Sequence, residues 1–219
     1  MKISKETLNI LKAYTAINPN LMLKPGKQLS TISPQKNIMS DVSIEEDFPV
    51  NFGIYDTQEF LLAVSLFNNP DFEFNEKSVI ISEGKNSITY WSAEEKVLTL
   101  PTKEVKFPDA EINFKLTAQI LELVNKSANV LKAADLSVIG DGKVISLKVG
   151  DKKVDSANSY QVEVGETSMN FVINLKIGLL KIVTGDYDVS ISTKKISKFK
   201  HCDKPLTYYI AVESDSIVE

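Results

Sequence analysis

The first segment with a clear hydrophobic period lies at the N-terminal end of the chain. Leu8, Ile10, Leu11 and Tyr14 recur at the three- and four-residue spacing that places side chains on one face of an α-helix. Ser4 precedes this segment and is a suitable N-cap, and the Asn18-Pro19 pair ends it because a residue before proline disfavours helical backbone. We therefore predict an amphipathic helix over residues 5–18, with lysines on its outer face.

The same spacing predicts further helices in both halves of the chain. Asp56 is a candidate cap for a helix over residues 57–67, which Asn68-Asn69-Pro70 would end. A third helix is predicted from Thr117 to about Leu131, and a short fourth one from Leu175 to Ile182. Two helices are therefore expected in each half.

Most of the remaining chain favours β-strands. Residues 21–55 are strand-like, and 136–148 alternate around Gly140-Asp141-Gly142, an Asp-Gly sequence typical of a hairpin turn. Further strands are expected near residues 79–90, 160–173 and 187–212. Strand-rich stretches mixed with a few helices indicate an α+β fold.

The organisation of the chain indicates two domains. Residues 98–110 hold two prolines and no clear period, so we interpret them as a linker between domains over 1–104 and 111–219. Each half opens with an amphipathic helix and later has a strand that leads into a helix. The run Asn51–Ile54 also resembles Asn170–Ile173 at that point. We interpret this as an internal duplication.

Composition limits the ways in which the chain could meet nucleic acid. The 219 residues carry a formal net charge of −4, with a pI of about 5.3. Domains that hold nucleic acid through phosphate affinity alone are usually basic overall, so DNA would have to meet a local basic face or be held by topology. A single cysteine excludes an intramolecular disulfide and fits a reducing compartment. With no apolar run of about 20 residues and no leader-like N-terminus, a cytoplasmic location is expected.

The sequence offers no set of residues that builds a catalytic or metal site. His201 and Cys202 are adjacent, and neighbouring side chains on a strand point to opposite faces. Gly140–Lys143 lacks the spacing of a phosphate loop, and Asp186–Asp188 lacks the other ligands of a calcium loop. The acids at 45–47 have no partner that would adapt one of them for acid–base chemistry. We predict no catalytic residue, no metal and no cofactor.

Several stretches resemble the sliding clamp of T-even-type bacteriophages. They lie in the same order over the whole chain: residues 1–26, 52–56 with the helix that follows, 170–174, and 208–215. The run Tyr208–Ala211 is also similar to the tail of cellular trimeric clamps. Residues 68–110 match least.

The resemblance implies the DNA-clamp fold, with two similar domains that each place two helices inside a ring and antiparallel sheets outside. Three chains would form a homotrimer that encircles double-stranded DNA without sequence preference and tethers DNA polymerase. An ATP-driven clamp loader and late-transcription factors would be further partners, and the location would be the cytoplasm of an infected bacterium. Physically, a few weak phosphate contacts suit a ring that must slide.

Two sets of site residues follow from the resemblance. The lysines expected to face DNA are Lys2, Lys5, Lys12, Lys126, Lys132, Lys176 and Lys181. A pocket for a peptide of the polymerase would be formed by Phe107, Pro108, Tyr209, Ile210, Ala211 and Val212. The alternative, that the second set only packs a domain interface, stays open at this point.

A different class of function competes with this interpretation. A non-catalytic structural or virion-assembly protein could use the same two domains and oligomerise through strand edges, without DNA inside. A neutral or acidic lumen would favour that alternative.

Overall fold

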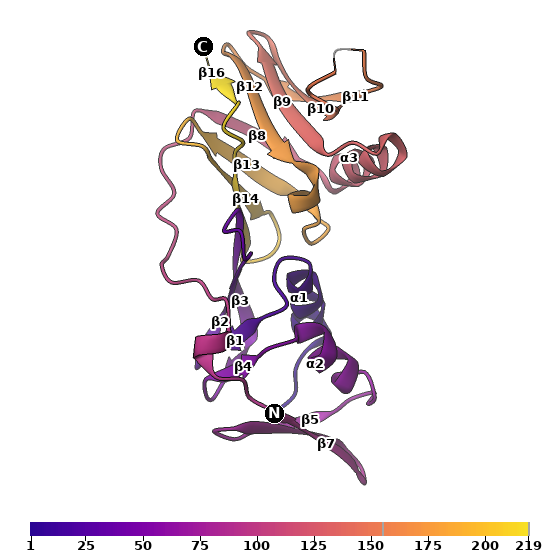
Figure 1. Ribbon diagram of the computed structural model, residues 1–219, viewed down its shortest axis with the longest axis vertical. Coiled ribbons are helices and arrows are strands. Elements are labelled where there is room, and N and C mark those ends of the chain that lie inside the picture. The colour runs from indigo at the N-terminus through magenta and orange to yellow at the C-terminus, as the bar shows by residue number, and fades with distance from the viewer. Residues whose placement is uncertain (155, 219) are drawn as a thin grey trace. The chain divides into compact units, whose positions relative to one another are not determined.

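The computed structural model of the chain describes residues 1–154 and 156–218 and divides into two compact units (Figure 1). Unit 1 is Met1–Glu104 and unit 2 is Val105–Glu219. The segment over residues 98–110, predicted to be a linker, has no regular secondary structure. Each unit is described by itself.

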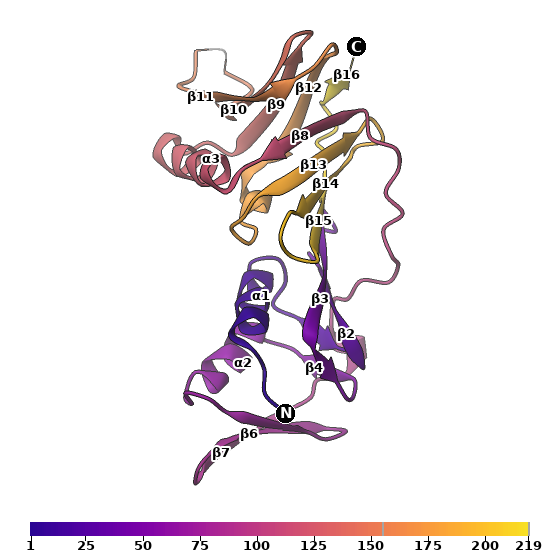
Figure 2. The same ribbon diagram turned by 180° about the vertical axis from the view of Figure 1, so that it is seen from behind.

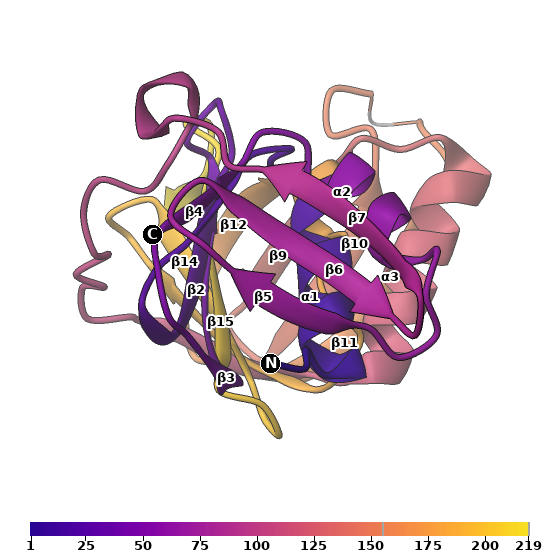
Figure 3. The ribbon, with the colours of Figure 1, turned by 90° about the horizontal axis from the view of Figure 1, so that it is seen from below.

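Unit 1 combines two α-helices with short antiparallel sheets. Its elements in order are α1 (Lys5–Thr15), β1 (Leu21–Leu23), β2 (Gly26–Ile32), β3 (Ile38–Phe48), β4 (Phe52–Ile54), α2 (Thr57–Val64), β5 (Asp71–Phe74), β6 (Ser78–Glu83), β7 (Asn86–Trp91) and the 3₁₀ helix η1 (Glu95–Val97). Strand β1 pairs with β4, β2 pairs with β3, and β5–β6–β7 form a meander that Figure 3 shows face on. Helices α1 and α2 lie on one side of the unit and β2 and β3 on the other in both Figures 1 and 2.

Aromatic side chains build the core of unit 1. Phe48, Phe52 and Phe72 are almost completely buried, and the ring of Phe74 meets the first two edge to face at centroid distances of 5.6 and 5.5 Å. Tyr14 is buried as well and fixes the inner face of α1. Such large apolar surfaces dominate the stability of a small domain.

Over residues 105–154 and 156–218, unit 2 has one α-helix and more extensive sheets. Its elements in order are β8 (Ile112–Leu116), α3 (Ala118–Leu131), β9 (Asp135–Asp141), β10 (Val144–Gly150), β11 (Tyr160–Glu166), β12 (Asn170–Lys176), the 3₁₀ helix η2 (Ile177–Leu180), β13 (Tyr187–Ser192), β14 (Ile196–His201), β15 (Leu206–Ala211) and β16 (Ile217–Val218). One sheet has the order β11–β10–β9–β12–β16, and β8, β13, β14 and β15 pair successively in another. All these pairs are antiparallel.

Side-chain caps start the three α-helices at the residues that the sequence predicted. Ser4 accepts a hydrogen bond from the Thr7 N–H, Asp56 from two N–H groups of α2, and Thr117 from one of α3. Because these oxygens pair helix N–H groups that lack partners, the predicted starts of α1, α2 and α3 are confirmed. Helix α2 ends at Val64, three residues before the predicted end.

The fourth predicted helix is a correction. Instead of an α-helix over 175–182, the structure has the four-residue 3₁₀ helix η2, and no side chain caps it. Gly178 lies inside this segment and is a poor helix former, whereas α2 has Asp56 at its start. Within the described residues, unit 2 therefore has one α-helix and one 3₁₀ turn where two α-helices were expected.

The predicted hairpin at residues 140–142 is present, and a glycine and an aromatic ring stabilise it. Gly142 adopts a φ of +81°, and the Asp141 carboxylate accepts hydrogen bonds from the N–H groups of Lys143 and Val144. Gly140 lies opposite Phe171 in the register, where a Cβ atom would come within 2.4 Å of the ring. The ring therefore occupies the space that any other residue at position 140 would need.

Candidate functional site

The solvent face of α1 carries two of the predicted lysines. Lys5 and Lys12 are exposed and lie seven positions apart, which places them on the same side of the helix. Ile10 and Leu11 point into the core. The predicted amphipathic pattern of α1 is therefore confirmed, and the chain presents a local basic face despite its acidic composition.

A carboxylate from a distant strand fixes the start of α1. Glu46 on β3 accepts hydrogen bonds from the Ser4 N–H and, at 2.6 Å, from the Thr7 hydroxyl. Burial raises the pKa of Glu46, but these two hydrogen bonds outweigh burial, so its pKa lies below the ordinary value. The carboxylate is therefore ionised at neutral pH and favours the N-terminal end of the helix dipole.

Lys2 does not belong to this open face. Its ammonium group forms an ion pair with Asp71 at 3.1 Å and donates a hydrogen bond to the Asn69 carbonyl at 2.6 Å. The nearby Met1 ammonium group donates to the Phe72 carbonyl, and the Phe72 N–H donates back to Met1. Lys2 therefore helps to attach the N-terminal residues to β5.

The lysines of unit 2 occupy three kinds of position. Lys126 is exposed on α3 and lies 3.9 Å from Glu122, one turn earlier on the helix. Lys132 is exposed as the left-handed C-cap of α3, and Lys181 is exposed directly after η2. Lys176 instead donates a 2.7 Å hydrogen bond to Asp135, which raises the pKa of its ammonium group. Lys126, Lys132 and Lys181 can thus meet an outside anion more readily than Lys176.

A cavity that the sequence did not indicate lies beside the basic face of α1. Apolar side chains of α1 and α2, including Leu8 and Leu61, line about 510 Å³ next to Lys12. Leu62 also lines it, although 61% of its surface is exposed. Helix periodicity predicted which residues lie inward, but not how far the two helices separate at the surface.

The pocket residues predicted on β15, which are Tyr209, Ile210 and Ala211, lie on two opposite faces of that strand. The ring of Tyr209 lies 6.2 Å from that of Phe107, and Ala211 is half-buried on the same face of the strand. The Lys198 ammonium group lies 4.6 Å above the Phe107 ring, and Pro108 is half-buried next to it in sequence. This group, Phe107, Pro108, Tyr209 and Ala211, is called the linker–tail surface below.

Ile210 and Val212 are the buried members of the predicted pocket. Ile210 is completely buried, because alternate residues of β15 point to opposite faces, and Val212, directly after β15, is 8% exposed. Ile210 therefore points away from Tyr209. The place of these two residues in a peptide pocket stays a prediction.

His201 and Cys202 occupy different environments. His201 is 3% exposed, packs against Tyr187 at a ring distance of 5.0 Å, and accepts the Asp203 N–H at Nδ1. Cys202 is exposed. Among residues 1–154 and 156–218, no group of three or more His, Cys, Asp and Glu side chains could hold a metal ion. In the same ranges, no helix has the length and apolar character needed to span a bilayer.

Comparison with solved structures defines the class of fold. The structure of A. fulgidus PCNA with the C-terminal region of FEN-1 bound superimposes on this chain with a TM-score of 0.69, at 11% sequence identity and with 96% of each chain covered. The fold is therefore the α+β fold of sliding clamps, as predicted from the sequence.

Comparison of sequences then defines the family. No protein-family model matches the sequence. The sliding clamp of Vibrio phage KVP40 is 31% identical over 222 residues, which cover 98% of this chain and all of the relative, and the sliding clamp of Escherichia phage RB69 is 26% identical with 99% and 98% covered. The chain belongs to the sliding-clamp family, which confirms the resemblance predicted from the sequence. Its function is that of a DNA sliding clamp that tethers a polymerase, and the structural-protein alternative is not favoured.

Proposed function

We propose that three copies of this chain close head to tail into a ring around duplex DNA, and that topology rather than affinity holds the ring on DNA. The observation that carries this proposal is the contrast between the net charge of −4 and the exposed lysines of α1. An acidic protein is repelled by DNA over most of its surface, while a few lysines at the lumen give weak, exchangeable phosphate contacts.

Edge strands support closure of the ring. Strand β7 is the outer strand of its meander, and Trp91 at its end is 70% exposed. Strand β11 is an edge of the five-stranded sheet in unit 2, and its residues are exposed or half-buried. Uncovered edges invite pairing, so β7 of one copy and β11 of the next form the subunit contact in this proposal.

The lumen lysines are Lys5 and Lys12 of unit 1 and Lys126, Lys132 and Lys181 of unit 2. Their exposure supports this role. Lys2 and Lys176 contribute less to DNA contact because Asp71 and Asp135 already pair with them.

The linker–tail surface receives a polymerase segment in this proposal. Its half-buried aromatic pair, Phe107 and Tyr209, and the neighbouring Lys198 suit a short segment with an apolar side chain and a carboxylate. The A. fulgidus protein binds the C-terminal region of FEN-1, which supports peptide recognition on this fold. The proposal includes two further partners, an ATP-driven loader and late-transcription factors. It places the protein in the cytoplasm of the infected host, and the chain itself catalyses no reaction.

Retention on closed and opened DNA tests the ring. The chain is loaded with its clamp loader and ATP onto nicked circular DNA, and half of the sample is then linearised with a restriction enzyme before gel filtration. We expect the protein to co-elute with the circles and to leave the linear DNA, because a ring slides off a free end. Equal retention on both forms would mean that affinity holds the protein, and the proposal would be wrong.

A further inference from the structure

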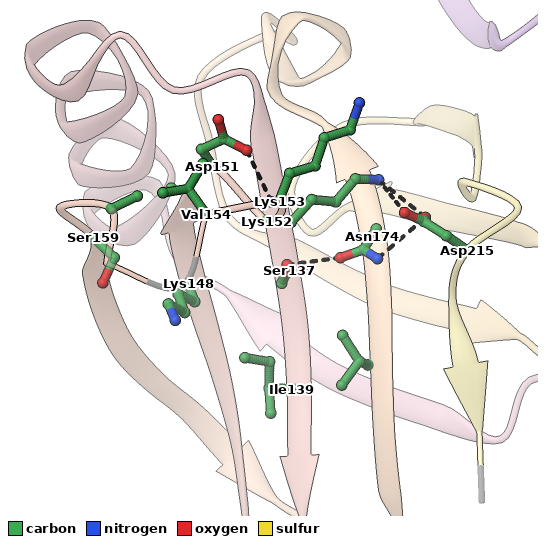
Figure 4. Close-up of a pocket in the computed structure, with 13 residues that line it drawn as sticks. Ser137, Ile139, Lys148, Asp151, Lys152, Lys153, Val154, Ser159, Asn174 and Asp215 are labelled. Atoms are coloured by element: carbon green, nitrogen blue, oxygen red, sulfur yellow. Dashed lines mark hydrogen bonds and ion pairs between the residues drawn. The ribbon is translucent and has the colours of Figure 1, made fainter.

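A second cavity, of about 360 Å³, lies on the five-stranded sheet of unit 2 (Figure 4), and none of its lining residues belongs to the linker–tail surface. Ile139 of β9 and Val172 of β12 are neighbours in the register and form its apolar floor. Lys148 and Lys153 line it from exposed positions. The cavity therefore combines a small apolar surface with a cationic rim.

One end of this cavity holds a site built for a carboxylate. The Lys152 Nζ and the Asn174 Nδ2 both contact the Asp215 carboxylate, at 2.8 and 3.2 Å (Figure 4). The Ser137 hydroxyl donates to the Asn174 Oδ1 at 2.7 Å and so orients the amide N–H toward Asp215. Only 13% of the Lys152 side chain is exposed. Lys152, Asn174 and Ser137 are called the carboxylate socket below.

The group that fills the socket is held weakly. The Asp215 side chain is 53% exposed and belongs to the C-terminal segment over residues 213–218. This segment pairs with β12 at Phe171–Val218 and Val172–Ile217, and its Glu213 N–H donates to the Asn174 carbonyl at 2.9 Å. Short, exposed pairing of this kind opens at low free-energy cost compared with global unfolding.

On the edge of β12, one backbone N–H group forms its hydrogen bond with a side chain instead of with a neighbouring strand. The Asn174 N–H donates to the Ser216 hydroxyl at 2.8 Å, where a paired strand would supply a backbone carbonyl. The Lys195 ammonium group holds the segment from outside, through the carbonyls of Ser214 and Ser216. If the segment moves away, an incoming extended chain can take over the Asn174 N–H by adding a strand to this edge.

Charge decides what replaces Asp215. Without it, the anionic neighbours of Lys152 among residues 1–154 and 156–218 are Asp135 at 4.0 Å and Glu213 at 3.9 Å, and Glu213 belongs to the same segment. A largely buried ammonium group that lacks a close partner is costly, so the open socket favours another carboxylate. The occupant must therefore be acidic.

We propose that the carboxylate socket and its cavity bind an extended acidic segment of a partner protein in exchange with Asp215. One carboxylate of this segment enters the socket, an apolar side chain lies on Ile139 and Val172, and a second acid faces Lys148 or Lys153. The chain's own sequence Glu213–Val218 has this chemistry, with the acids Glu213 and Asp215 and the β-branched apolar residues Ile217 and Val218. The site is distinct from DNA contact and from the linker–tail surface, and it does not depend on ring closure.

Competition with a peptide tests the proposal in the full-length chain. The probe is a fluorescein-labelled peptide with the sequence of residues 213–218, and its anisotropy is followed at low salt up to about 1 mM protein, the concentration range that detects weak complexes. We expect Asp215→Asn to bind the probe about threefold or more tightly than the wild type, because removal of one exposed ion pair frees the socket more often. Lys152→Met should abolish binding, and Lys152→Arg should keep it.

Two controls separate exchange from a purely structural tie. A peptide in which asparagine replaces the aspartate should not bind, and Lys194→Met, at an exposed lysine outside the cavity, should behave as the wild type. Equal affinity of the wild type and Asp215→Asn, or no probe binding by either, would overturn the proposal and leave Asp215 as a structural contact. Thermal unfolding checks that Lys152→Met is folded. If it is not folded, binding to the Asp215→Asn variant is compared for the aspartate peptide and the asparagine peptide, and only the aspartate peptide should bind.

Discussion

Units 1 and 2 repeat one plan with different degrees of completeness. In both, an α-helix is followed by four strands, then a second helical segment, then three strands: α1, β1–β4, α2, β5–β7 in one, and α3, β9–β12, η2, β13–β15 in the other. Strand β8 precedes α3 and pairs with β13. In unit 1 only Met1 takes the corresponding place, through its two hydrogen bonds with Phe72 of β5. A shared plan with little shared sequence is what a duplication leaves when packing is conserved more strictly than residue identity.

The differences separate the two units by role. Unit 1 keeps a capped second helix and has the exposed Lys5 and Lys12 on its first. Unit 2 lengthens the strands next to its helices, seven residues in β9 and β12 against three in β1 and β4, and reduces the second helix to a 3₁₀ turn. We infer that both units supply DNA-facing charge, Lys5 and Lys12 from unit 1 and Lys126, Lys132 and Lys181 from unit 2, and that unit 2 has the larger sheet surface for protein partners.

Charge reversal on the first helix of each unit should give the largest effect. In the triple variant Lys5→Glu, Lys12→Glu, Lys126→Glu, we expect loading onto DNA to fall sharply, because weak attraction becomes repulsion. Folding should hardly change, since exposed charges contribute only a few tenths of a kcal/mol, about 0.5 at most. Raised salt should narrow the difference by screening over about 8–10 Å.

The control for this variant reverses three other exposed lysines, Lys27, Lys194 and Lys200. It carries the same change in net charge and should load nearly as well as the wild type. The double variant Lys5→Glu, Lys12→Glu is then compared with Lys126→Glu alone. The two losses of loading measure how much each unit contributes to DNA contact. If the triple variant loads normally at low salt, these helices do not face DNA.

The edge strands provide the second test. Trp91→Lys on β7 removes a large exposed ring and adds a charge, so we expect each subunit contact to weaken by about 2 kcal/mol or more, the range of interface tryptophans. Sedimentation equilibrium should show three chain masses for the wild type at micromolar concentration and smaller species for the variant. Trp91→Phe should lie between them. A variant that stays trimeric would place the contact on other strands.

A carboxylate accepts hydrogen bonds at the start of α1 and another at the start of α3: Glu46 for α1 and Asp186 for α3. Glu46→Ala leaves the buried Thr7 hydroxyl and the Ser4 N–H without their partner, so a loss of about 1–3 kcal/mol in the free energy of unfolding is expected. Asp186 accepts one hydrogen bond from the Ala118 N–H of α3 and is half-buried, so Asp186→Ala should cost less. Chemical denaturation measures both. Equal losses would contradict the greater role given to Glu46.

The same carboxylate predicts a dependence of stability on pH. The folded-state pKa of Glu46 lies below the unfolded value of about 4.3, so its contribution is complete above that value and is lost as the pH falls through the folded pKa. The wild type should therefore lose more stability than Glu46→Gln between neutral pH and about pH 3. Parallel curves for the two proteins would show that Glu46 is not responsible.

The smallest effect is expected at the linker–tail surface. Tyr209→Ala should weaken binding of a polymerase-derived peptide by about 1–2 kcal/mol, because an aromatic anchor is lost while the sheet remains. Fluorescence anisotropy of the labelled peptide measures it. Substitution at the buried Val212 is unsuitable as a test, since a charge there would destabilise unit 2 itself. Unchanged affinity would move the peptide to another surface.

Local signals in the sequence predicted much of the fold, and distant contacts limited the rest. Helix periods and the caps Ser4, Asp56 and Thr117 were sufficient for α1, α2 and α3, because both act within one turn. The alternation along β15 already implied that Ile210 and Tyr209 point apart. The engagement of Lys2 by Asp71 and of Lys176 by Asp135 could not be predicted, since the partners are far apart in sequence. The carboxylate socket was missed for the same reason.

Gly140 and Phe171 have a consequence for how this sequence can evolve. Since the ring of one residue fills the space where the other lacks a side chain, the two positions are constrained as a pair. A methyl group gained at 140 is tolerated only in a lineage that has already given up the ring at 171, so the order in which the two mutations arise matters. Across phage descendants, this pair should therefore change together and only rarely one at a time.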